Sequence, residues 1–344
     1  MQIFNSKGTR PENGRIAWID TAKAIGIFLV VLGHLNLPKG LYDAIYTFHM
    51  PLFFVLAGMT FNGELPFALF LKKKFKALVI PYFFFSAIFF AFWLFVGRHY
   101  GVDAGSGPSV PESEVILQIF YGIGSSLYPT PLWFLTCLFM TEILFYFFVR
   151  QDSQKMKVVE LLLILSAGLT YEHFSPTLLP RLFWNIDFAM YYLPFVALGY
   201  YAFNSGFFNR KNIKQIAVVS FMACGAVFAI LNNLMTGLHQ HWYNSVLTLI
   251  PAVAGCAAAV SISIAIPGNA PMNFLGKNTL ALFALHLIGL NILKGILHFV
   301  LQVDLAILDG CIAYNILLAL ACLVLLAPAA MFLQKFSPWT VGHK

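Results

Sequence analysis

The chain has 344 residues, of which 60% are hydrophobic and 10% are charged, and its mean hydropathy is +0.79. Soluble domains carry about 25% charged residues, so the composition excludes a soluble globular protein and predicts a polytopic membrane protein. The net charge of +7 does not indicate a nucleic-acid-binding protein. The basic residues lie in short segments between apolar stretches, where membrane topology explains them.

Ten apolar segments have the length that a helix needs to cross a bilayer core, about 20 residues for about 30 Å. They cover residues 16–35, 44–62, 77–97, 131–149, 158–174, 186–203, 214–234, 243–266, 279–299 and 306–333. In lipid a chain must satisfy its backbone polar groups internally, and these segments are too long and too uniformly apolar for barrel strands. We therefore expect an all-α bundle of about ten transmembrane helices.

The distribution of Lys and Arg predicts the topology. If the N-terminus is cytoplasmic, sixteen of these residues lie on the inner side and three lie in outer loops. Such a bias is typical of the positive-inside rule, so both termini are expected in the cytoplasm. The expected organisation is a cytoplasmic segment 1–15, one membrane domain 16–334 and a cytoplasmic tail 335–344.

The first apolar segment contains ionisable residues. The stretch WIDTAKAIGIFLVVLGH carries Asp20, Lys23 and His34. Lys23 and His34 are eleven residues apart, which on a helix places them within about 20° of one azimuth and about 16 Å apart along the axis. Charges within a span are costly and usually functional. In the alternative, Lys23 reaches toward the headgroups, Asp20 neutralises it and His34 only caps the helix.

The second segment adds another histidine near the same membrane depth. His49 precedes Pro51, and a short connection separates it from His34. Gly26 and Gly33 lie near the stripe of the first helix, so another helix or a ligand can approach closely there. The two histidines are candidates for an acid–base pair, because an imidazole titrates near neutral pH. A metal site is the rival interpretation, but no third ligand has suitable spacing and we expect no metal.

These stretches resemble a known family. The first segment, followed by FHMPLFFVLAG, is similar to the integral-membrane acyltransferases of type 3, which include sugar O-acetylases of bacterial surface polysaccharides. The resemblance continues in KKKFKALVIPY, PLWFLTCLF, YYLPFVALGYY and NTLALFALH. The family usually has an Arg ten residues before the histidine, where this chain has Lys23. A lysine there resembles the branch of fucose and other sugar O-acetylases, and it lacks the bidentate fork of arginine.

The resemblance implies transfer of an acyl group, expected to be acetyl, from cytoplasmic acyl-CoA to a hydroxyl of a glycan or lipid-linked sugar. It implies a bacterial cytoplasmic membrane as the location, and acetyl-CoA as a co-substrate with no bound cofactor. His34 and His49 are the expected catalytic residues. The expected donor-binding residues are Asp20, Lys23, Lys72, Lys73, Lys74 and His286. The expected acceptor-binding residues are Trp133 and Glu142.

Other interpretations of these residues remain open. The lysines of KKKFK can be a topology signal, and Trp133 can be an interfacial anchor. A lone buried histidine such as His286 is more often a core residue. Intramembrane charges also fit a secondary transporter of a small anionic or sugar-like solute, although the chain lacks detectable inverted halves with matching broken helices.

Overall fold

The computed structural model describes residues 15–98, 111–123, 131–175, 179–209, 212–235, 246–266 and 268–342. Within these ranges every regular element is a helix, which confirms the all-α prediction. The chain divides into two compact units. The first unit comprises residues 1–61, 194–279 and 309–315, and the second comprises residues 62–193, 280–308 and 316–344.

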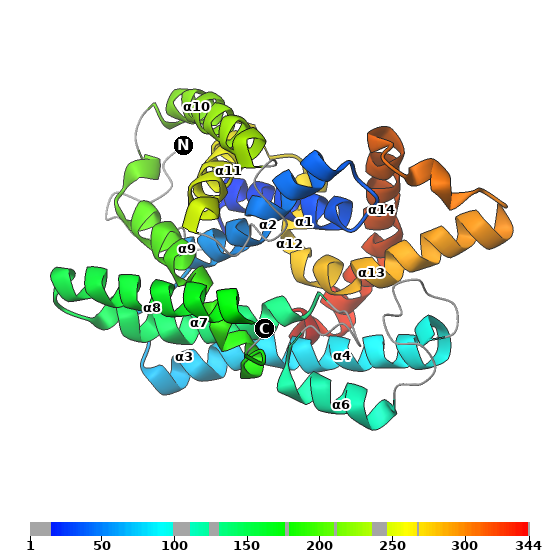
Figure 1. Ribbon diagram of the computed structural model, residues 1–344, viewed down its shortest axis with the longest axis horizontal. Helices are drawn as coiled ribbons and strands as arrows, with labels where there is room; N and C mark the ends of the chain where they lie inside the picture. The colour runs from blue at the N-terminus through cyan, green and yellow to red at the C-terminus, as the bar shows by residue number, and fades with distance from the viewer. Residues whose placement is uncertain are drawn as a thin grey trace. The chain divides into compact units, whose positions relative to one another are not determined.

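Seven helices in the described residues are long and apolar enough to cross a membrane (Figure 1). They are Lys39–Met59, Phe67–Gly97, Trp133–Arg150, Ile213–Ile230, Thr248–Ala265, Thr279–Val300 and Ile312–Phe336. The chain is therefore a multi-pass membrane protein.

The three other expected spans are also helical. They form α1 (Ala17–Gly33), α8 (Gln154–Phe174) and α9 (Ile186–Asn204). Helix α1 has 17 residues, which corresponds to roughly 26 Å, slightly less than the hydrocarbon core. Helix α8 carries Lys155, Lys157 and Glu160 in its first two turns. The number of ten spans and the orientation of the termini stay predictions.

In the first unit, α1 packs against α2 (Lys39–Met59), α11 (Val246–Ala265) and the short α12 (Ala270–Lys277). Helix α10 (Ile213–Met235) lies along α11, as Figure 1 shows. Helix α2 also meets the second half of α9 backbone to backbone, because a Cβ added to Gly58 would lie 2.0 Å from the carbonyl oxygen of Val196. Glycines thus allow the closest helix contacts of this unit, as is common in membrane bundles.

The second unit contains a helix of 31 residues formed by α3 (Phe67–Lys74), η1 (Phe75–Val79), α4 (Ile80–Phe92) and η2 (Trp93–Gly97). It starts ten residues before the expected position 77, so the KKKFK lysines lie within a helix and not in a connecting segment. The turn η1 is a π-helix directly before Pro81. Pro81 has no N–H to donate to the carbonyl of Ala77, and the wider turn accommodates this missing bond.

The remaining elements of the second unit pack around this helix and α7 (Trp133–Arg150). Helix α7 contacts η1, η3 (Phe183–Asn185) and α8, and α4 contacts α6 (Glu112–Tyr121). The other elements of the chain are η4 (Phe207–Asn209), α13 (Thr279–Gly295), η6 (Ile296–Val300), η7 (Leu305–Leu308), α14 (Ile312–Phe336) and η8 (Pro338–Val341). Helix α14 begins at Ile312, six residues after the expected start, because η7 is a separate 3₁₀ turn.

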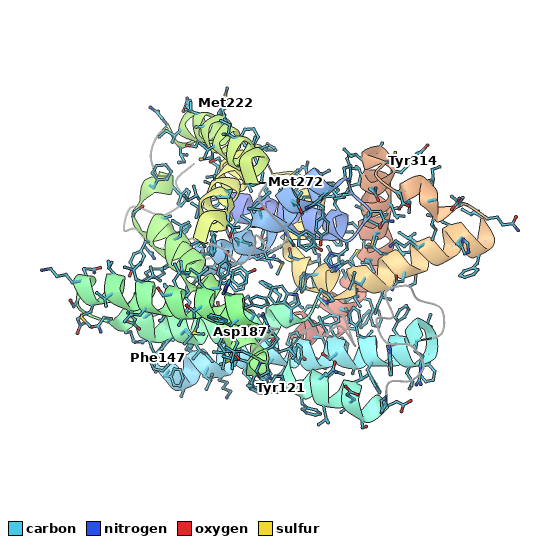
Figure 2. The ribbon with its side chains drawn as sticks, in the orientation of Figure 1. Tyr121, Phe147, Asp187, Met222, Met272 and Tyr314 are labelled. Atoms are coloured by element: carbon cyan, nitrogen blue, oxygen red, sulfur yellow. The ribbon has the colours of Figure 1, made fainter. Side chains whose placement is uncertain are left out.

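Large apolar side chains cover the outer faces of several helices. Met222 on α10, visible in Figure 2, is 68% exposed, and Val324 on α14 is 73% exposed. Exposure of such faces to water is unfavourable, whereas contact with the hydrocarbon of a bilayer is not. This surface agrees with helices that contact lipid.

Candidate active site

Helix α1 ends beside the first turns of α2. It stops at Gly33, and His34 is its C-cap residue with φ −91° and ψ 16°. A Cβ added to Gly26 would lie 2.8 Å from the ring of Phe53, and one added to Gly33 would lie 3.2 Å from the ring of Tyr46. The glycines near the predicted stripe therefore receive side chains of α2.

At the other end of α1, Asp20 and Lys23 form the ion pair that their spacing predicts, with Nζ and Oδ1 3.9 Å apart. Asp20 is only 6% exposed. Helix α12 covers it so closely that a Cβ added to Gly276 would lie 2.2 Å from the Asp20 carbonyl oxygen. The Lys23 side chain is 34% exposed, so its ammonium is half-buried.

The two predicted catalytic histidines lie close together. The ring centroid of Tyr46 is 6.3 Å from that of His34 and 4.9 Å from that of His49. His49 is 2% exposed, whereas His34 is half-buried. Of the two, His34 is the residue that a substrate can contact.

Backbone carbonyls fix the tautomer of both imidazoles. The Nδ1 atom of His34 is 3.0 Å from the carbonyl oxygen of Val30, and the Nδ1 atom of His49 is 2.7 Å from that of Ile45. A carbonyl oxygen only accepts hydrogen bonds, so each Nδ1 carries a hydrogen and donates it. In the neutral ring the lone pair is then on Nε2, the atom that can take a proton or attack a carbonyl carbon.

The loop after His34 is held by the segment 309–315 of the same unit. The carbonyl oxygen of Asn36 accepts from the Gly310 N–H at 2.9 Å and from Asn315 Nδ2 at 3.1 Å. The Asn36 amide also donates to the carboxylate of Asp309. These bonds restrict the connection between α1 and α2 and therefore the position of His34.

In the second unit, the structure joins two residues that the sequence assigned to different substrates. Lys74 forms an ion pair with Glu142, which is 2% exposed. The other carboxylate oxygen of Glu142 has no hydrogen-bond partner among the described residues. Lys72 and Lys73 are exposed on α3. Glu142 therefore neutralises the charge of Lys74, whereas the ammonium groups of Lys72 and Lys73 are accessible.

Trp133 begins α7 within an aromatic cluster. Its ring centroid is 5.3 Å from that of Phe188 and 6.5 Å from that of Tyr192. The guanidinium of Arg181 lies 3.5 Å from the Phe188 ring centroid and 2.9 Å from the carboxylate of Asp187. Asp187, labelled in Figure 2, is fully buried. Trp133 therefore belongs to a partly exposed aromatic cluster beside a buried ion pair.

The strained turn before α9 is a feature that the sequence analysis missed. Trp184 and Asn185 have φ angles of 52° and 55°, a conformation that costs about 1–3 kcal/mol for each non-glycine residue. The Asn185 amide donates to the Gly122 carbonyl at 2.8 Å and to Thr136 Oγ1 at 2.9 Å. The available signal was the asparagine itself, since this residue tolerates the left-handed region.

His286 has the environment of a core residue. It is fully buried, and its Nδ1 atom donates to the Phe283 carbonyl at 2.6 Å. The thiol of Cys322 donates to the carbonyl oxygen of His286. These contacts lie within the second unit and favour the structural interpretation of this histidine over the donor-binding one. No group of three His, Cys, Asp or Glu side chains suited to a metal ion occurs among the described residues.

Tyr46 was not among the predicted site residues. It lies three residues before His49, and on a helix this spacing places two side chains on one face. That spacing was the signal available from the sequence.

Comparison with known proteins identifies a family over most of the chain. The model of the acyltransferase domain of type 3 matches residues 16–334. No curated protein and no solved structure matches the chain.

Proposed function

The chain belongs to the type 3 acyltransferase family. We propose that it moves an acetyl group from acyl-CoA to a hydroxyl of a carbohydrate. The acceptor lies at or beyond the outer face of a bacterial cytoplasmic membrane. The observation that carries this proposal is the pair of imidazoles in the first unit, each with Nδ1 bound to a carbonyl. This arrangement holds the Nε2 lone pairs for acid–base or nucleophilic chemistry.

In the proposed reaction, His34 Nε2 removes the proton of the acceptor hydroxyl while the oxygen attacks the thioester carbonyl carbon. The new C–O bond forms, the C–S bond breaks, and the thiolate of CoA leaves and takes up the proton from the imidazolium. In a two-step variant, Nε2 itself attacks the thioester carbonyl carbon, the C–S bond breaks and the CoA thiolate leaves. The acceptor oxygen then attacks the acyl-imidazole, the C–N bond breaks, and the hydroxyl proton passes to the CoA thiolate. His49 is buried beside this site and acts as the partner base or orients the acceptor.

The donor is assigned to the end of α1 that carries Asp20 and Lys23. The half-buried Lys23 ammonium is a cation suited to a phosphate of acyl-CoA. The exposed Lys72 and Lys73 attract the anionic donor by their charge. Lys74 is paired with Glu142, and we assign it to the anchoring of α3 on α7 in place of donor binding. We keep Trp133 as the acceptor contact, because its ring belongs to a partly exposed aromatic cluster.

The test is transfer of radiolabelled acetyl from acetyl-CoA to surface polysaccharide in membranes that contain the wild-type chain, His34→Ala or His298→Ala at matched expression. His298 is an exposed histidine of η6 and serves as the matched control. We expect label in the polysaccharide with the wild type and the control, and none with His34→Ala.

Two results would contradict the proposal. Full transfer by His34→Ala would show that His34 is structural. Uptake of an anionic or sugar-like solute by wild-type vesicles, without any label in the glycan, would favour the transporter.

A further inference from the structure

The ring of Tyr46 lies near both imidazoles. It meets His49 edge-on, with an interplanar angle of 73° and a centroid distance of 4.9 Å, and it lies 6.3 Å from the His34 ring. All three side chains belong to α1, α2 and their connection within one unit. A single ring therefore contacts both predicted catalytic groups.

Two neighbours fix the position of this ring. Residue 33 is a glycine, and its missing Cβ would lie 3.2 Å from Tyr46 Cε2. Tyr42, one turn earlier on α2, stacks on Tyr46 with ring centroids 4.1 Å apart and an interplanar angle of 26°. The backbone of Gly33 on one helix and the Tyr42 ring on the other thus hold Tyr46 in place.

We propose that Tyr46 is a positioning residue of the acyl-transfer site, and that its ring holds the His34 and His49 imidazoles in the orientation in which both Nδ1 atoms bind backbone carbonyls. This inference rests on the proposed function. Without the ring, each imidazole can rotate about its side-chain bonds and lose the alignment of Nε2 with the reacting atoms. Misplacement of a catalytic group by about 1 Å can cost about 100-fold in rate.

We assign the role to the ring and not to the hydroxyl, because Tyr46 meets both imidazoles through its ring. This distinction gives a pair of variants with opposite expectations. Tyr46→Phe keeps the ring and is expected to retain transfer within about threefold of wild type. Tyr46→Leu removes the ring and is expected to lower kcat by about tenfold or more, with KM for acetyl-CoA and for the acceptor unchanged.

Phe48→Leu is the matched structural control. Phe48 is also an aromatic residue of α2, but its ring packs against Gly255 and against the Phe228 ring, 5.3 Å away, on α11 and α10. It is expected to alter stability without a selective loss of kcat. A KM increase in Tyr46→Leu, or a kcat loss of the same size in Phe48→Leu, would assign Tyr46 to packing alone.

A second measurement is independent of acetyl transfer. Diethyl pyrocarbonate modifies accessible imidazoles, and mass spectrometry gives the rate at each histidine. The Tyr46 ring shields His49, so Tyr46→Leu should increase the modification rate of His49 while Tyr46→Phe and Phe48→Leu leave it unchanged. An unchanged rate in Tyr46→Leu would overturn the inference even if the chain transferred no acetyl. A chain that transfers acetyl through His34 but tolerates Tyr46→Leu would refute the inference and leave the proposed function intact.

Discussion

Substitution of Gly276 by alanine is expected to separate α12 from the Asp20 end of α1. The added methyl carbon would lie 2.2 Å from the carbonyl oxygen of Asp20 and 2.7 Å from its Cα. Ordinary contact begins near 3.4 Å, so the two backbones must move apart by about 1.2 Å at this point. Both clashing groups belong to the backbone, and no side chain can rotate to relieve them.

Gly276→Ala is expected to lower the free energy of unfolding by about 1–3 kcal/mol, the usual range for an overpacked core. The clash is between backbone groups, which favours the upper part of this range. A gain of up to about 1 kcal/mol from the higher helix propensity of alanine opposes it. Gly225→Ala isolates that gain, since Gly225 lies within α10 of the same unit and nothing lies within 4 Å of its added Cβ. Gly225→Ala should therefore be neutral or stabilising, and Gly276→Ala destabilising.

The assay is the thermal unfolding midpoint of both purified variants in the same detergent, followed by the KM for acetyl-CoA. Displacement of α12 also disturbs the Asp20–Lys23 pair, so the KM of Gly276→Ala should rise while that of Gly225→Ala stays unchanged. If the two variants unfolded at the same temperature, α12 would not pack on Asp20 as described. The assignment of the donor end of α1 would then lose its structural support.

Other substitutions test separate parts of the site. Lys74→Met should destabilise the chain by about 3–5 kcal/mol because it leaves the buried Glu142 carboxylate unpaired. The double variant Lys74→Met/Glu142→Leu should recover much of that loss, as measured by denaturation midpoints. Lys23→Arg should keep acetyl transfer while Lys23→Met raises the KM for acetyl-CoA, because the site requires a positive charge and not the bidentate geometry of a guanidinium. Equal KM values for Lys23→Met and wild type would exclude Lys23 from donor binding. Asn185→Ala should destabilise by about 1–3 kcal/mol through lost hydrogen bonds to buried acceptors, whereas a midpoint equal to wild type would show that the strained turn is not held by this amide.

Local patterns predicted the first half of the candidate site. The pairing of Asp20 with Lys23 follows from their spacing on one helix, and the proximity of His34 and His49 follows from the short connection between two helices. The same applies to the close approach at Gly26, which a small residue permits. Each of these predictions depends only on residues near one another in sequence, and each is present in the structure.

Interactions between distant segments were not predictable in this way. Helix α12 has eight residues and is too short for a hydropathy window of about 19 residues to detect. Yet it buries Asp20, a residue about 250 positions earlier. The Lys74–Glu142 ion pair joins residues 68 positions apart, and a sequence without an alignment gives no sign of such a contact. The lysines of KKKFK appeared equivalent for the same reason.

The contrast between Lys74 and Lys23 shows that the distance to the paired carboxylate, and not burial alone, distinguishes two intramembrane cations. Both side chains are partly covered, at 20% and 34% exposure. Lys74 makes direct contact with its carboxylate, whereas the Lys23 ammonium stands 3.9 Å from Asp20. At such a distance the pair is only weakly engaged, and a second anion can approach the ammonium without displacing the first. This geometry is the reason that we propose Lys23, and not Lys74, as the contact for a phosphate-bearing donor.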